Sequence, residues 1–214
     1  MKKPFRSYMF SVAAVALALP PVAGPPGAPS AKPFEYLGAC QIEPDEWTDG
    51  DSFRVRLRDG RIETFRLYFV DTTESRSRGK RSDEQAAYFG ITHEQAIELG
   101  KQAKTFTARA IAQPFTVYTR WRLVFVGSRF YAVVLTSDGQ DLAELLVRAG
   151  LARIYGTRTP LPEGRDSRTY LRHLRQLEAE AKAQKVAGWG IVRPRSIGRP
   201  SRQSGEAGLV LGIF

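Results

Sequence analysis

Three short segments of this chain carry carboxylates and arginines whose types and spacing suit the hydrolysis of a phosphodiester. They are Asp49-Gly50-Asp51, Arg66 followed after four residues by Asp71-Thr72-Thr73-Glu74, and the single Arg129. That reaction needs positive charge at the phosphoryl oxygens, a hard cation or its equivalent, and a group that takes a proton from water. Each segment alone has an ordinary explanation, because Asp and Gly form turns and strand arginines usually face solvent. Their combined order is far harder to ascribe to chance.

Alternating apolar and polar residues predict the strands that must position these segments. The predicted strands cover residues 37–42, 52–57, 62–70, 115–122 and 123–136, and the predicted helices cover residues 92–113, 141–150 and 167–187. Asp59-Gly60 predicts a two-residue hairpin between the second and third strands. Thr92 with Gln95 and Asp141 with Glu144 predict capping boxes. The acidic segments then lie at the start of the second strand and the end of the third.

The segment from Ser75 to Arg81 is polar and basic and has no apolar face. It therefore predicts a solvated surface loop. Two interpretations of its cations stay open: they add contacts to phosphate, or they are simply solvated. The residues concerned are Arg76, Arg78, Lys80 and Arg81.

The composition favours a polyanionic partner and leaves few catalytic alternatives. The 214 residues carry a formal charge of +10, which fits nucleic acid or anionic lipid. Cys40 is the single cysteine, so the chain can form neither an internal disulfide nor a multi-thiolate zinc site. We expect Cys40 to be a half-buried strand residue. His93 and His173, the two histidines, fall on predicted helices and are interpreted as cap and surface residues.

The first residues have the layout of an export signal. Lys2, Lys3 and Arg6 precede an apolar run over residues 9–19, which is too short to span a bilayer comfortably. We expect cleavage between Ala23 and Lys32 and secretion or periplasmic export, with a retained membrane anchor as the alternative. The expected organisation is a signal and linker over residues 1–31, a domain over 32–191 and a flexible tail over 192–214.

The order of the acidic and arginine segments resembles the staphylococcal nuclease family. The resemblance continues through residues 143–154, through His173-Leu174-Arg175 and to Trp189, and covers about residues 37–191. It implies an α+β fold, mainly β with helices, in which a five-stranded Greek-key OB barrel carries three α-helices. It also implies a calcium-dependent nuclease that cleaves DNA and RNA, prefers single strands and acts as a monomer without a stable protein partner.

The same resemblance assigns roles to individual residues. Asp51 and Asp71 would be carboxylate ligands of Ca²⁺ and Thr72 a carbonyl ligand, an oxygen-only set that suits this ion. Asp49 would lie just outside the ligands, and Glu74 would orient or deprotonate water. Arg66 and Arg129 would bind the phosphate and stabilise the transition state, leaving a 3′-phosphate. Tyr155 has a counterpart among the family's substrate-binding tyrosines.

Several positions depart from the family's pattern. Thr73 stands where the family commonly has proline, the loop over residues 75–90 is longer, and Gly127-Ser128 replaces a Lys-Tyr pair. Base preference is therefore not predicted. Two other functions stay open: a catalytically inert OB module that binds nucleic acid or protein, and a basic protein of the membrane surface.

Overall fold

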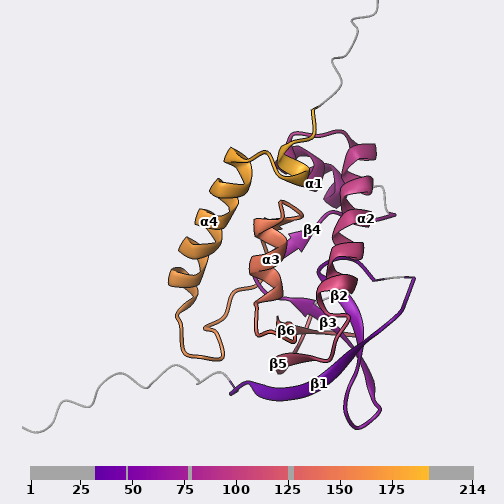
Figure 1. Ribbon diagram of the computed structural model, residues 1–214, viewed down its shortest axis with the longest axis vertical. Helices are drawn as coiled ribbons and strands as arrows, with labels where there is room; N and C mark the ends of the chain where they lie inside the picture. The colour runs from indigo at the N-terminus through magenta and orange to yellow at the C-terminus, as the bar shows by residue number, and fades with distance from the viewer. Residues whose placement is uncertain (1–31, 47, 77–78, 125–127, 193–214) are drawn as a thin grey trace, which may run out of the picture. The chain divides into compact units, whose positions relative to one another are not determined.

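Five strands close into a barrel that holds the hydrophobic core of the protein (Figure 1). The computed structural model describes residues 32–46, 48–76, 79–124 and 128–192. The barrel strands are β1 (Glu35–Glu43), β2 (Ser52–Arg56), β3 (Ile62–Leu67), β5 (Phe115–Leu123) and β6 (Arg129–Leu135). Their order around the barrel is β1-β2-β3-β6-β5. β3 and β6 run parallel, and all other neighbouring pairs are antiparallel.

The apolar side chains that alternate along the predicted strands fill the interior of the barrel. Alternate side chains such as Phe53, Val55, Phe65 and Val117 are buried inside. Asp59-Gly60 lies in the turn that joins β2 to β3, but the loop has three residues, 58–60, and not the two expected, because the Leu57 N–H bonds to the Arg61 carbonyl across it. Gly60 takes a φ of 87°, a conformation that glycine adopts without strain. The expected α+β class and the five-stranded barrel are confirmed.

The helices are α1 (Lys80–Phe89), α2 (His93–Ala110), α3 (Leu142–Arg148), α4 (Ser167–Ala183) and the 3₁₀ turn η1 (Ala187–Trp189). Figure 1 shows them in the upper part of the view, with the barrel strands below. The capping box of Thr92 and Gln95 is formed, and Asp141 accepts from the N–H groups of Ala143 and Glu144. No helix in the described segments has the length and apolar character needed to cross a membrane.

Helix α1 corrects the expectation of a loop over residues 75–90 and of three helices. Its buried residues are Ser82, Gln85, Ala86 and Phe89, which have helical spacing. Two of the four are polar, so the apolar pattern that marks a helix was missing from the sequence. Gly90 ends α1 in the left-handed conformation, with a φ of 71°.

The expected third strand is broken after Leu67. Phe69 has a φ of 69°, and the chain then forms β4 (Val70–Thr72), which leaves the barrel and pairs with β7 (Ala152–Ile154). In this small sheet Asp71 lies opposite Arg153. The break therefore moves the residues expected at the end of one barrel strand into a separate two-stranded sheet.

The remaining expectations about single residues have mixed outcomes. Cys40 lies on β1 and is fully buried rather than half-buried, and burial raises the pKa of its thiol to about 11. His93 opens α2 beside Asp83, and His173 on α4 lies 3.1 Å from Glu144, so both occupy the ordinary helix positions expected. The proposed export signal and the tail beyond Val192 lie outside the described residues.

Candidate active site

Asp71 on β4 is the centre of a cluster of buried charges. Its carboxylate accepts from four side chains, two at each oxygen. Oδ1 accepts from Arg66 Nη2 at 2.6 Å and from Arg81 Nη2. Oδ2 accepts from Arg153 Nε at 2.7 Å and Gln85 Nε2 at 3.0 Å. Burial alone would raise the pKa of Asp71, but Arg81 and Arg66 outweigh burial, so the pKa lies below its ordinary value. Asp71 is therefore ionised at neutral pH.

Arg66 connects Asp71 with a second buried carboxylate, Asp51. Arg66 Nη2 lies 2.8 Å from Asp51 Oδ2 and 2.6 Å from Asp71 Oδ1. The contact with Asp51 is an ion pair without hydrogen-bond geometry, so Asp51 Oδ2 is a buried oxygen that accepts no hydrogen bond from the described residues. Burial raises the pKa of Asp51 to about 6 against the opposing charge of Arg66. Two segments that are separate in sequence thus meet at one guanidinium.

Glu74 lies at the edge of this cluster, close to Asp49. Arg81 Nε is 3.2 Å from Glu74 Oε1. Burial, and then the charge of Asp49, raise the pKa of Glu74 to about 7. Ser75 fixes Asp49 by donating its N–H at 3.3 Å and its hydroxyl at 2.8 Å to Asp49 Oδ1. A carboxyl group that titrates near neutral pH is suited to accept a proton from water.

Gln85 on α1 holds the segment from Asp71 to Glu74 in place. Its Nε2 donates to the Thr72 carbonyl at 2.8 Å as well as to Asp71, and its Oε1 accepts from the Glu74 N–H at 3.1 Å. The Thr72 carbonyl, which the family resemblance assigned to a cation, therefore accepts a hydrogen bond from Gln85 here. The sequence analysis did not identify Gln85. Its spacing of four from Arg81 would have placed both on one helix face, had the helix been recognised.

Two glycines allow helix α2 to pack closely against both acidic segments. Gly100 lies on α2, and Gly50 lies in the first acidic segment. A Cβ atom on Gly100 would lie 2.5 Å from the Thr73 carbonyl oxygen and 2.8 Å from the Glu74 carbonyl. A Cβ atom on Gly50 would lie 2.7 Å from Ala103 Cβ. Real Cβ atoms do not approach so closely, so both positions require glycine for the packing seen. The helix that the capping box predicts is thus the support on which the site segments lie.

Closure of the barrel brings Arg129 to the same end of the molecule. Arg129 opens β6 and pairs with Thr64 of β3, and its Nη1 donates to Ser52 Oγ at 3.3 Å. Ser52 follows Asp51 directly and pairs with Arg66 across β2 and β3. The two arginines expected at the phosphate therefore come from adjacent parallel strands. Their proximity depends on the barrel and cannot be read from either strand alone.

Tyr155, the substrate-binding candidate, follows β7 and is 54% exposed. The guanidinium of Arg153 lies over its ring, 4.2 Å from the centroid, while Arg153 Nε binds Asp71. Arg153 thus links an exposed aromatic ring to the buried carboxylates. It was not identified in the sequence analysis, because only the pairing of β4 with β7 places it opposite Asp71.

Comparison with known protein families identifies the family of this chain. A family model described as staphylococcal nuclease homologue matches residues 64–190. The match covers more than half of the 214 residues and includes Arg66, Asp71, Glu74 and Arg129. The chain belongs to this family, and membership indicates a nuclease-type function. Asp49 and Asp51 precede the matched range, and the structure connects them with the site through their contacts with Ser75 and Arg66.

The carboxylates of the site suit a hard cation, although arginines contact them in this structure. Asp51 and Asp71 offer carboxylate oxygens around one point, and the buried Asp51 Oδ2 is without a hydrogen bond. No group of three or more His, Cys, Asp or Glu residues in the described part of the chain is arranged to hold a metal ion. Four side-chain nitrogens donate hydrogen bonds to the two oxygens of Asp71. The residue types therefore fit Ca²⁺ only if one of these donors moves away from Asp71.

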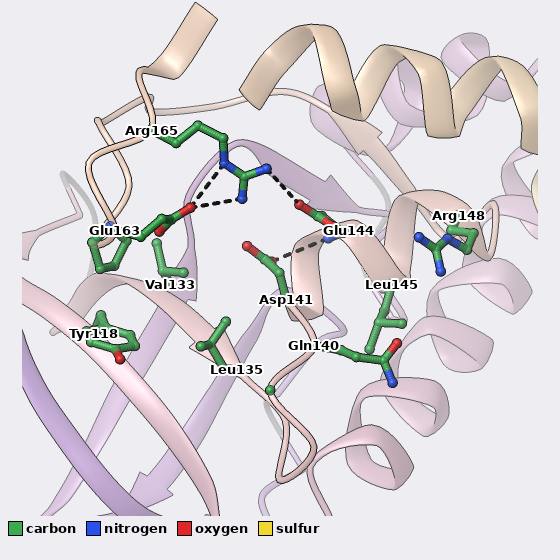
Figure 2. A pocket seen from close by; sticks show the side chains of 12 residues that line it. Tyr118, Val133, Leu135, Gln140, Asp141, Glu144, Leu145, Arg148, Glu163 and Arg165 are labelled. Carbon is green, nitrogen blue, oxygen red and sulfur yellow. Dashed lines mark hydrogen bonds and ion pairs between the residues drawn. The ribbon is translucent and has the colours of Figure 1, made fainter. Parts of the chain in front are cut away.

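A separate cavity of about 540 Å³ lies away from these residues, between β5, β6 and the start of α3. Figure 2 shows Arg165 between Glu163 and Glu144 at its wall, with Tyr118 and Leu135 on the strands below. Arg165 Nη2 is 2.9 Å from Glu163, and Arg165 Nη1 is 3.6 Å from Glu144. These acids are already neutralised by an arginine. None of the site residues predicted from the sequence lines this cavity.

Proposed function

We propose that this protein is a calcium-dependent endonuclease that hydrolyses phosphodiester bonds of DNA and RNA to 3′-phosphate ends. The observation that supports this most is the position of Glu74. Its carboxyl group has a pKa of about 7 and lies at the edge of the cluster that contains two further carboxylic acids and several arginines. Family membership supports the nuclease class, whereas calcium dependence and the 3′-phosphate product are part of the proposal.

In the proposed reaction, Glu74 takes a proton from a water molecule as the water oxygen attacks phosphorus. The bond between phosphorus and the 5′-oxygen breaks, the 5′-oxygen takes up a proton from solvent water and leaves as a hydroxyl, and the phosphate stays on the 3′ side. Arg66 and Arg129 stabilise charge that develops on the phosphoryl oxygens, because planar guanidinium groups match phosphate geometry. Asp51 and Asp71 would hold the cation. When bound, Ca²⁺ would supply further positive charge to the phosphoryl group.

The natural form of the substrate and the location of the protein are also proposals. A net charge of +10 favours a nucleic acid substrate, and the exposed Tyr155 offers a ring on which an unpaired base can stack. We therefore propose a preference for single strands. Activity as a monomer is proposed from the family resemblance alone. The charged and apolar N-terminal residues support export with removal of the leader, which the intact mass of the exported protein tests.

Incubation of the purified protein with denatured DNA and with RNA, in Ca²⁺ or in EGTA, tests the proposed activity. We expect cleavage in Ca²⁺ only, with products from which a phosphatase releases 3′-terminal phosphate. Products with 5′-phosphate ends would contradict the assigned bond cleavage. Binding of the nucleic acid without cleavage in Ca²⁺ would instead identify an inert OB module, the alternative function.

A further inference from the structure

The inserted helix α1 places a guanidinium where the site would need a cation. Arg81 Nη2 donates to Asp71 Oδ1, and Arg81 Nε lies 3.2 Å from Glu74 Oε1. One arginine therefore neutralises both an expected cation ligand and the expected general base. Arg81 comes from the segment by which this chain exceeds the family pattern.

The hydrogen bonds of Asp71 leave no room for an additional ligand. A carboxylate offers about four lone-pair sites, and the Asp71 carboxylate has four donors, two at each oxygen. A cation that binds Asp71 must therefore displace at least one of these donors. The burial and the other interactions of each donor show which one can be displaced at the lowest cost in free energy.

Three of the four donors are held by other interactions and are buried. The side chains of Arg66 and Arg153 are 9% and 6% exposed, and Gln85 is fully buried. Gln85 also binds the Thr72 carbonyl, and Arg66 also contacts Asp51. Displacement of any of these would leave a buried polar group without a partner, which is costly.

Arg81 is the donor that can leave at least cost. Its side chain is 44% exposed, so water can replace the bonds that it gives up. We propose that Arg81 acts as a displaceable internal cation: it neutralises Asp71 and Glu74 in the cation-free protein and leaves when Ca²⁺ binds. This inference rests on the proposed function and adds a regulation of the same site. Its consequence is that Arg81 lowers the affinity for Ca²⁺ and couples cation binding to the release of Glu74.

Calcium binding by the full-length protein, followed by isothermal titration calorimetry without nucleic acid, tests this role. Arg81→Gln should bind Ca²⁺ about tenfold more tightly than the wild type, within the usual range for coupled binding. Arg81→Lys should fall between them, because lysine keeps the charge but cannot contact Asp71 and Glu74 through a planar fork. Lys80→Gln is the matched control, since it removes the same charge from the neighbouring exposed residue of α1.

The proposal is wrong if Arg81→Gln binds Ca²⁺ no more tightly than Lys80→Gln. Weaker binding by Arg81→Gln would show that Arg81 positions the cation ligands instead. Circular dichroism of each variant, with Arg81→Lys as the conservative replacement, separates these outcomes from misfolding. If no variant binds Ca²⁺, displacement is also refuted, and nucleic acid cleavage in EGTA then decides separately whether the proposed nuclease function stands.

Discussion

Replacement of Glu74 by glutamine should reduce activity and increase stability at the same time. Gln keeps the size of the side chain but can neither ionise nor accept a proton from water. We expect turnover to fall by about 10²-fold or more, the usual contribution of a general base. The backbone should hold its position, because the bond from the Glu74 N–H to Gln85 does not involve the replaced side chain.

The gain in stability follows from the pKa of Glu74, which rises from 4.5 to about 7 on folding. Because the folded protein binds this proton more tightly than the unfolded chain, the free energy of unfolding falls as pH rises from about 4.5 to about 7. One pKa unit corresponds to about 1.4 kcal/mol, so a rise of about 2.5 pKa units sets an upper bound of about 3.5 kcal/mol. The side chain is 26% exposed, and solvent screening reduces our expectation to about 1–2 kcal/mol.

Urea denaturation of the wild type and Glu74→Gln at about pH 4 and about pH 8, together with nuclease assays, measures both effects. The variant should be more stable at the higher pH and equal to the wild type at the lower one. Glu63→Gln on β3 is a matched control, because its side chain is equally exposed, at 26%, but lies beside Arg61 outside the site. A Glu74→Gln protein that retains full turnover, or that is less stable than the wild type at the higher pH, would refute the reasoning.

Three further changes test other parts of the structure. Arg66→Lys keeps the charge but loses the planar fork, so turnover should fall about 10²-fold with unchanged circular dichroism; full activity would contradict its role at the phosphate. Burial raises the pKa of Asp141 from 3.8 to about 6, so wild-type stability should fall as pH rises through this range. Asp141→Asn retains a helix-capping acceptor and should be about 1–2 kcal/mol more stable than the wild type near neutral pH. Urea denaturation measures this difference, which should disappear at about pH 4. Gly100→Ala should cost about 1–3 kcal/mol in thermal denaturation and lower turnover, because its Cβ would displace the Glu74 backbone.

Local signals in the sequence predicted much of the scaffold correctly. The Asp59-Gly60 turn, the Thr92 capping box and the alternation in β2 and β3 each depend on residues close together in the chain. Such signals depend on a few neighbouring residues, so they can be recognised without knowledge of the fold. The family pattern of carboxylates and arginines is also carried by short segments, so the family could be predicted from the sequence, whereas the roles of the single residues stay predictions.

The failed expectations share one physical cause, which is contact with parts of the chain that are distant in sequence. Helix α1 buries the polar residues Ser82 and Gln85, of which Gln85 contacts the site, and so shows no continuous apolar stripe. The end of β3 at Leu67, the turn at Phe69 and the separate strand β4 depend on pairing with β7, which lies far along the chain. Neither partner is visible within the local segment.

The sequence by itself determined the barrel strands, the main helix caps and the residue types available for phosphodiester chemistry. Only the tertiary structure decided that Arg66, Arg81, Gln85 and Arg153 meet at Asp71. It also decided that Glu74 titrates near neutral pH, because its pKa depends on burial and on Asp49 across the loop. Charge interactions of this kind act through space between separate elements, so their strength is set by the fold and not by spacing along the chain.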